Sequence, residues 1–341
     1  MKTRCFFSGV IMLLFSCFFI FSCASCGETD TPSLNEAQIV HNVAERFLKA
    51  SVKILVFNYY ETEEDLGGEK KGVMLVDSGS GYIYNREHWL FTAHHVLDCE
   101  TSKTLHIGQQ TPMGPMTAEV SWQYKKSRYF IVRDCSIVNA ISKAANKFKK
   151  EKAYRYPDIR VFNNGQPFFL DCVSEQDFDD FFSSSQELAA SHEFYITPDN
   201  YRNDPKNDSA GVRLKHLDGQ LDFVTLADHD TDHDLMYGET IYIWGAPRMI
   251  IEQLYKGVSA NAHLDNLVLE KLDFDTKNFA LTDMVIAEGS SGSMLFRVNE
   301  RGEGKIIGLA SFMFPPPPFS VGYAFVKIGP FLKSLGFIEK P

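Results

Sequence analysis

Short runs of β-branched and aromatic residues dominate the chain after residue 50. The clearest are VKILVFNYY (52–60), GVMLVDSGSGYIYN (72–85) and HWLFTAHHVLD (88–98), which are separated by Gly, Asn or acidic turns. This pattern is typical of strands, and repeated short strands predict a barrel or a sandwich. Just before them, Ala37–Ala50 carries apolar residues at helical spacing, which predicts a short lead-in helix.

The N-terminus has the layout of a secretory signal, with Lys2 and Arg4 followed by an apolar run and then small residues. Its end resembles a bacterial lipoprotein cleavage site, in which a cysteine becomes the lipidated first residue. Cys26 is the favoured cysteine and Cys23 is the alternative. A simple cleaved signal or an uncleaved anchor would also fit a run of this length. We therefore expect a signal peptide over 1–26, a tether and lead-in helix over 27–48, and a globular domain over 49–341.

Composition narrows the possible functions. The apolar and charged fractions of the 341 residues are those of a globular protein, and the net charge is −10. No Lys/Arg run is long enough to follow a phosphate backbone, so nucleic-acid binding is not expected. Beyond the N-terminal segment only Cys99, Cys135 and Cys172 remain, which permits one disulfide of unassigned pairing. They form no CxxC pair, and no structural zinc or other cofactor is expected.

A glycine- and serine-rich turn lies near the C-terminus, with the sequence Gly289-Ser290-Ser291-Gly292-Ser293 between apolar residues. A serine hydroxyl becomes a nucleophile when a neighbouring base takes its proton. Glycines beside it allow backbone amides to turn toward a developing oxyanion. Ser291 is therefore a candidate nucleophile, although such pentapeptides are also common in ordinary turns.

A candidate base closes the third strand, in Thr92-Ala93-His94-His95-Val96. Histidine suits this role because its ordinary pKa lies near neutral pH. Together with the preceding GSGYI, this strand resembles the catalytic-histidine strand of trypsin-like serine proteases, particularly of the HtrA (Deg) branch. The resemblance implies that His95 is the base and leaves His94 without a chemical role. The sequence 282–293 resembles the serine loop of the same family.

The orienting acid has four candidates: Asp134, Asp208, Asp230 and Asp234. Resemblance of the later strands favours Asp208, because DSAGV from Asp208 fits the family's strand entry, with Gly211 where an aliphatic residue is usual. The order His, Asp, Ser is that of the chymotrypsin-like class. This choice implies an insertion of several tens of residues, over about 140–195. We interpret it as a decorated loop; a lid or a partner site is the alternative.

The acidic and histidine-rich run 228–234 has ligand types that metals accept. The resemblance instead makes it a turn that leads into a strand, so no metal site is expected there.

The resemblance also implies the rest of the site. The amides of Gly289 and Ser291 would form the oxyanion hole. Val285 would be the floor of the substrate pocket, and its apolar side chain favours aliphatic P1 residues. One wall would be the strand around Leu309, Ala310 and Ser311, whose backbone would pair with an extended substrate.

The sequence thus predicts an all-β fold of two six-stranded antiparallel β-barrels, with a partly helical insertion and a short C-terminal helix over 328–335. No PDZ domain is expected within it. The predicted function is that of a serine endopeptidase acting on exported or unfolded proteins, located in the bacterial cell envelope through a lipid anchor. The alternative is a catalytically inactive, protease-like binding or chaperone lipoprotein.

Overall fold

The computed structural model describes residues 34–64, 72–111, 114–133, 159–162, 169–184, 191–215, 221–245, 253–261, 274–284, 286, 289–314 and 322–339, together with 141, 143, 144 and 147. The expected signal peptide over 1–26, both lipidation cysteines (Cys23 and Cys26) and the pocket residue Val285 lie outside these residues. The chain divides into two compact units, Met1–His41 and Asn42–Pro341. Of the first unit, only the beginning of helix α2 is described.

Helix α2 spans Leu34–Ala50 and is the helix predicted before the first strand. It begins three residues earlier than the apolar pattern indicated. In the second unit its buried residues are Ala44, Phe47 and Ala50, which recur at a spacing of three and so share one face. The Phe47 ring packs edge-on against Phe296, with the ring centroids 5.2 Å apart.

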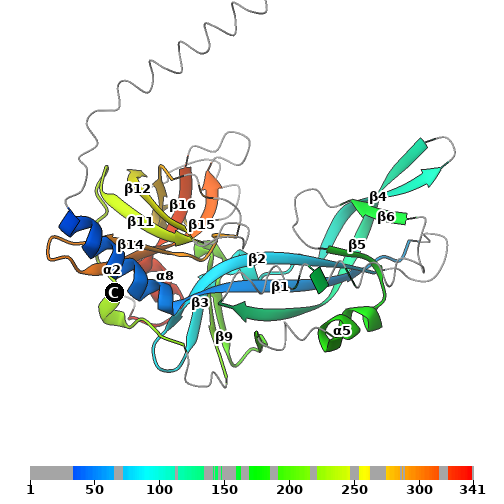
Figure 1. Ribbon diagram of the computed structural model, residues 1–341, viewed down its shortest axis with the longest axis horizontal. Coiled ribbons are helices and arrows are strands. Elements are labelled where there is room, and N and C mark those ends of the chain that lie inside the picture. Colours follow the sequence, from blue (N-terminus) through cyan, green and yellow to red (C-terminus); the bar gives the residue numbers. More distant parts are fainter. Residues whose placement is uncertain are drawn as a thin grey trace, which may run out of the picture. The chain divides into compact units, whose positions relative to one another are not determined.

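The first sheet has ten strands, and β1 and β2 run through it as a long antiparallel pair (Figure 1). Its main path is β6-β4-β5-β1-β2-β3-β10-β9, while β7 pairs with β2 and β8 pairs with β5. The bounds are β1 Ser51–Glu61, β2 Gly72–Tyr84, β3 Trp89–Ala93, β4 Ser102–Thr111, β5 Gly114–Val132, β6 Ile159–Phe162, β7 Phe169–Val173, β8 His192–Phe194, β9 Tyr201–Asp204 and β10 Ser209–Arg213.

The second sheet is a closed six-stranded barrel with the order β11-β12-β13-β16-β15-β14. Its bounds are β11 Thr240–Gly245, β12 Gln253–Asn261, β13 Phe279–Thr282, β14 Met294–Val298, β15 Gly304–Phe314 and β16 Gly322–Lys327. Helix α8 follows over Ile328–Ser334.

The two sheets repeat one strand order. In the first sheet the order is β5-β1-β2-β3-β10-β9, and in the barrel it is β14-β11-β12-β13-β16-β15. Strand β1 thus pairs with β5 as β11 pairs with β14. The predicted β-rich class is confirmed. The two sheets differ in closure, because β14 and β15 pair and close the barrel, whereas the path of the first sheet ends at β9.

The described parts of the segment expected as an insertion belong to the first sheet and its core. Helix α5, Glu175–Ser184, buries Phe178, Phe181 and Phe182 on one face. These rings cluster with strand residues that include Phe57, and the rings of Phe57 and Phe182 lie 5.0 Å apart. Arg128 lies over the Phe182 ring and forms an ion pair with Glu193 of β8. In its described residues the segment is thus a packed extension of the sheet, formed by this helix with β6, β7 and β8.

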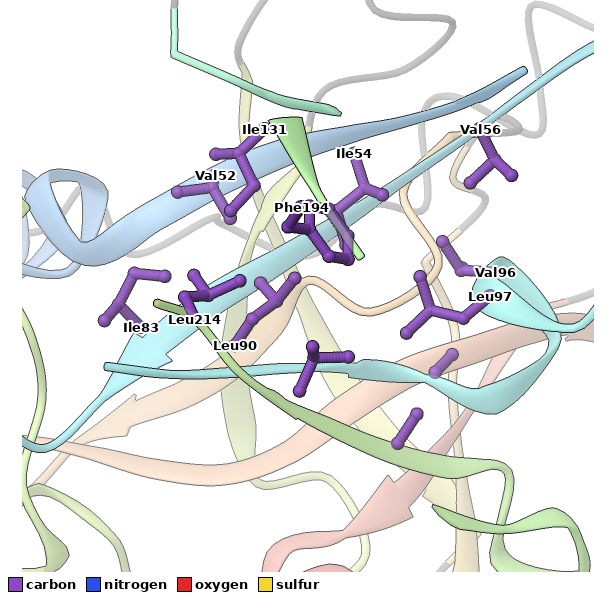
Figure 2. Close-up of a cluster of buried hydrophobic side chains, with 13 residues drawn as sticks. Val52, Ile54, Val56, Ile83, Leu90, Val96, Leu97, Ile131, Phe194 and Leu214 are labelled. Atoms are coloured by element: carbon purple, nitrogen blue, oxygen red, sulfur yellow. The ribbon is translucent and has the colours of Figure 1, made fainter. Parts of the chain in front are cut away.

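A second cluster of buried side chains lies where β1, β3 and β10 meet the turn after β3. Figure 2 shows Val96 and Leu97 from this turn beside the strand residues of the cluster. The packing of these two side chains fixes the position of the turn 94–97, which carries the candidate base. Burial of each contributes roughly 1.5–3 kcal/mol.

Among the described residues, no helix combines the length and the apolar character needed to cross a membrane. Of the cysteines, Cys99 is free and partly buried.

Candidate active site

His95 lies in the single helical turn α3, His94–Leu97, which directly follows β3. The side chains of Val96 and Leu97 point into the core. The side chain of His95, just before them, is directed away from the core and is 48% exposed. This local pattern presents one edge of the imidazole ring to solvent and the other to the protein.

Asp208 meets the protein-facing edge of that ring. His95 Nδ1 lies 2.9 Å from Oδ2 and 3.1 Å from Oδ1, and the His95 backbone N–H donates to Oδ1 at 2.9 Å. The carboxylate also accepts a hydrogen bond from Ser311 Oγ. Asp208 is 1% exposed and lies between η1 (Pro205–Asn207) and β10. Its φ of 44° is left-handed, a conformation that Asp tolerates better than most residues.

The electrostatics of this pair follow from burial and mutual attraction. Burial alone would raise the pKa of Asp208, but the charge of His95 and hydrogen bonds from His95 and Ser311 outweigh it and lower that pKa. Burial would likewise lower the pKa of His95, but attraction to Asp208 and their hydrogen bond raise it. The carboxylate is therefore ionised at neutral pH and stabilises a proton on the imidazole.

His94 has a different set of partners. Its backbone N–H donates to the carbonyl of Asp208 at 2.9 Å, and its Nδ1 lies 3.1 Å from the hydroxyl of Tyr201. These contacts fix the turn that carries both histidines, and they involve none of the carboxylate oxygens of Asp208.

The serine turn is shaped by two glycines in the left-handed region, Gly289 at φ 92° and Gly292 at φ 87°. Only glycine adopts this conformation at little cost. A Cβ on Gly292 would lie 2.0 Å from the carbonyl oxygen of Ser80 and 2.4 Å from Thr92 Oγ1. Position 292 therefore requires glycine for its backbone conformation and for the space around it.

Ser80 of β2 anchors this turn to the first sheet. Its N–H donates to the carbonyl of Ser291 at 2.7 Å, and its Oγ donates to the carbonyl of Gly289 at 2.8 Å. The carbonyl of Ser80 in turn accepts from Thr92 Oγ1 at 2.7 Å. Since Thr92 lies three residues before His95 on β3, one short chain of hydrogen bonds connects the segments of the candidate base and the candidate nucleophile.

The oxygen of Ser291 is bound on the barrel side of the turn. Its Oγ donates to the carbonyl of Ser311 at 2.9 Å and lies 3.1 Å from the hydroxyl of Tyr323. Ser291 and His95 both belong to the described part of the chain, and no hydrogen bond joins their side chains. The structure thus joins His95 to Asp208 directly and links both to Ser291 through Ser311.

The predicted substrate strand is β15, and its three assigned residues differ in whether their main-chain N–H and carbonyl groups are already bonded. Leu309 pairs with Met294 on one side and Val326 on the other. The N–H and the carbonyl of Ala310 are both bonded to the serine turn, at Ser293 and Gly292. Leu309 and Ala310 are fully buried. Ser311 is equally buried, but no backbone hydrogen bond joins it to the serine turn, so pairing with a further strand on this edge would begin at this residue.

Two of the remaining acid candidates lie in the described residues, and neither contacts His95 there. Asp230 pairs with Arg297 at 2.7 Å, and Asp234 is exposed in the loop before β11. Asp134 lies outside the described residues.

In the run 228–234, Asp228 contacts Arg46 and Thr225, while His233 contacts Glu239 and lies 3.8 Å from Asp230. Within the described ranges, no three His, Cys, Asp or Glu side chains come together as a metal site.

Sequence reasoning missed Ser80 and Tyr323 and gave Ser311 only a backbone role. The signal for Ser80 was weak, because it is one small residue in a glycine-rich strand, DSGSG. Tyr323 and Ser311 look like ordinary strand residues. Their importance follows from cross-strand neighbours that periodicity does not reveal.

No model of a known protein family matches the chain, and no curated protein matches it. Its fold is similar to that of solved HtrA-type proteases. The structure of HtrA-type protease AlgW with a decapeptide is 13% identical at a TM-score of 0.47, and covers 87% of this chain and 66% of that one. The serine endoprotease from Yersinia pestis is 14% identical at a TM-score of 0.43, over 89% and 66%.

Deg5 is 15% identical at a TM-score of 0.43, over 87% of this chain and 92% of its own. The chain thus spans just under two thirds of the AlgW and Yersinia structures. The similarity concerns the fold and assigns no residue.

Proposed function

We propose that this chain is a serine endopeptidase in which His95, Asp208 and Ser291 form the catalytic triad. The observation that carries the proposal is the buried carboxylate of Asp208 held against His95 Nδ1 at 2.9 Å, with Ser311 as a second donor. A carboxylate in this position fixes the imidazole tautomer that leaves Nε2 free to accept a proton. Ser291 lies on a glycine turn that is bonded to the same strands.

Each group then has one task. His95 Nε2 removes the proton of Ser291 Oγ as that oxygen attacks the peptide carbonyl, and the resulting imidazolium protonates the leaving amine. A water molecule then repeats the sequence on the acyl-enzyme, with His95 as base and Ser291 as leaving group. Asp208 stabilises the imidazolium in both halves of the reaction.

The oxyanion is assigned to the amides of Gly289 and Ser291. Support comes from the turn itself, whose anchoring bonds use the carbonyls of Gly289 and Ser291 and the N–H of Gly292. The two assigned amides are not donors in any of these bonds. Loss of one such donor typically lowers kcat by roughly 10²–10³.

Substrates are proposed to be extended or unfolded polypeptides with an aliphatic P1 residue. The P1 preference rests on Val285 in the sequence, and the extended form rests on strand addition at Ser311 of β15.

Export and membrane anchoring through Cys26, or Cys23, remain a proposal from the N-terminal sequence. Metabolic labelling with a radioactive fatty acid tests it: Cys26→Ala is expected to lose the label, and loss with Cys23→Ala instead would assign the other cysteine. Label retained in both variants would refute the anchor.

A non-catalytic binding role is the second candidate, and one observation favours it. Ser291 Oγ is bonded to Ser311 and Tyr323 instead of His95. The unusual Gly211 gives it no support, because a Cβ there would lie 3.3 Å from the Phe91 ring and 3.4 Å from Leu335. Gly211 is thus explained by packing.

Hydrolysis of unfolded casein by the purified chain separates the two candidates. The proposal predicts cleavage by the wild type and its loss in both His95→Ala and Ser291→Ala, with all three proteins folded at the assay temperature. His95→Ala is expected to unfold at a lower temperature than the wild type, because it leaves the buried Asp208 carboxylate without its partner. Lys143→Ala, at an exposed site with no contact to the triad residues, is the control and is expected to cleave normally. Binding of casein without hydrolysis by the wild type would favour the non-catalytic role.

A further inference from the structure

Three oxygen atoms form a closed group behind the candidate nucleophile. Ser291 Oγ donates to the carbonyl of Ser311 at 2.9 Å, and the hydroxyl of Tyr323 lies 3.1 Å from Ser291 Oγ and 3.3 Å from that same carbonyl. The Ser291 proton is therefore directed to the Ser311 carbonyl, and the Tyr323 proton is shared between that carbonyl and the oxygen of Ser291. In this orientation the Ser291 hydroxyl cannot donate its proton to His95. Activation of a serine as a nucleophile requires that donation.

This group depends on an irregularity in β15. The register against β16 pairs Ala310 with Phe325 and Phe312 with Ala324, so Ser311 has no cross-strand partner there. Such a bulge redirects a residue out of the ladder and is common beside active sites. At this bulge the Ser311 side chain reaches Asp208, while its carbonyl receives Ser291.

Tyr323 is held firmly in place on the neighbouring strand. It pairs with Thr282 on one side and Met313 on the other, and it is 3% exposed within the barrel core. Its ring therefore has little freedom to move, and the hydroxyl is a fixed feature behind Ser291.

We propose that Tyr323 is a positioning residue that holds Ser291 in a resting orientation, from which an extended peptide substrate releases it. The inference rests on the proposed peptidase function. A peptide that adds to the edge of β15 at Ser311 would donate a main-chain N–H to the Ser311 carbonyl. That bond replaces the one from Ser291, whose proton becomes available to His95. Small reagents without such an N–H leave Ser291 in its resting orientation.

The rate of labelling by a small fluorophosphonate, in the absence of peptide, tests this directly. Tyr323→Phe removes only the hydroxyl and is expected to label about three- to tenfold faster than the wild type, the effect of one net hydrogen bond. Tyr255→Phe is the matched control, since Tyr255 packs against the same core cluster, and its labelling rate should equal the wild type. Ser291→Ala should not label.

Peptide hydrolysis supplies a readout that a purely structural role would not move. Because an extended peptide already releases Ser291, kcat for such a peptide should change less than twofold in Tyr323→Phe. For a small ester the same substitution should raise kcat by the three- to tenfold seen in labelling. An equal effect on both substrates would contradict the proposal.

The wild type alone gives an independent test that needs no variant to fold. A peptide N-methylated at the amide that would meet Ser311 cannot donate there, so its kcat should fall at least fivefold below that of the unmodified peptide; equal kcat values would overturn the proposal. Equal labelling of wild type and Tyr323→Phe, with Ser291→Ala unlabelled, refutes the role of Tyr323 and leaves the peptidase. Absence of labelling and of hydrolysis in both refutes the peptidase and the inference together.

Discussion

Replacement of Gly292 by alanine is the sharpest probe of the serine turn. The residue has φ 87°, and an added Cβ would lie 2.0 Å from the carbonyl oxygen of Ser80 and 2.4 Å from Thr92 Oγ1. Both atoms belong to the hydrogen-bond chain that anchors the turn, so the turn itself must move.

Two costs follow from these values. A left-handed alanine costs about 1–2 kcal/mol, and relief of the overlap adds roughly 1–3 kcal/mol. We therefore expect Gly292→Ala to lose about 2–5 kcal/mol of unfolding free energy. Since a contact of 2.0 Å must open beyond 3.0 Å, the turn shifts by about 1 Å, and a misplacement of this size can lower kcat about 10²-fold.

Gly238→Ala is the matched control. Gly238 has φ 79°, but nothing lies within 4 Å of its added Cβ, so only the conformational cost of about 1–2 kcal/mol applies. Urea unfolding and kcat on a peptide substrate would be measured for both variants. Wild-type activity and stability in Gly292→Ala, or equal losses in the two variants, would refute the reasoning.

Three further predictions concern single groups. Ser311→Ala removes a donor to a buried carboxylate, so urea unfolding should show a loss of about 1.5–3 kcal/mol. Ser259→Ala should show no such loss, because its buried Oγ has no hydrogen-bond partner among the described residues; similar losses in the two variants would count against the Ser311–Asp208 bond. The base must be neutral and the pKa of His95 is raised above 6.5, so kcat/KM should rise with pH through a midpoint above 6.5, and Asp208→Asn should lower that midpoint; an unmoved midpoint would argue against the pair. Burial lowers the pKa of His229 to about 4, so the unfolded chain binds a proton there first as pH falls below 6.5. The free energy of unfolding should then drop by about 3 kcal/mol between pH 6.5 and about 4. Denaturant titrations that give the same free energy of unfolding across this pH range would refute the contribution of His229.

Local pattern was enough to predict much of this fold. Runs of β-branched and aromatic residues predicted the three strands that lead up to His95, and the apolar spacing predicted helix α2, because these features depend on neighbours in sequence. The glycines at 289 and 292 also had a local signature, since a left-handed turn selects glycine.

Contacts between residues far apart in the sequence could not be predicted from local pattern. The segment 140–195 was interpreted as a partly helical insertion that forms a decorated loop. The sequence did not show that the Phe residues of helix α5 are buried against Phe57, which lies more than a hundred residues away. The size of the first sheet could not be foreseen for the same reason, because β6, β7 and β8 pair with distant strands.

The candidate site divides in the same way. Motifs pointed to His95 and Ser291, and the resemblance of the later strands favoured Asp208 among four acids, while the contact of Asp208 with His95 depends on the pairing of β10 with β3. The contacts of Ser80, Ser311 and Tyr323 depend on register and on a bulge, which no local pattern encodes.

Site-resolved labelling with a fluorophosphonate tests the central claim most directly. The purified chain would be labelled, digested, and read by mass spectrometry. A serine peptidase built on this site is predicted to carry one phosphonyl adduct, on Ser291, which disappears in Ser291→Ala and is slowed at least 10²-fold in His95→Ala. An adduct on another residue, or labelling that persists in His95→Ala at the wild-type rate, would contradict the assignment.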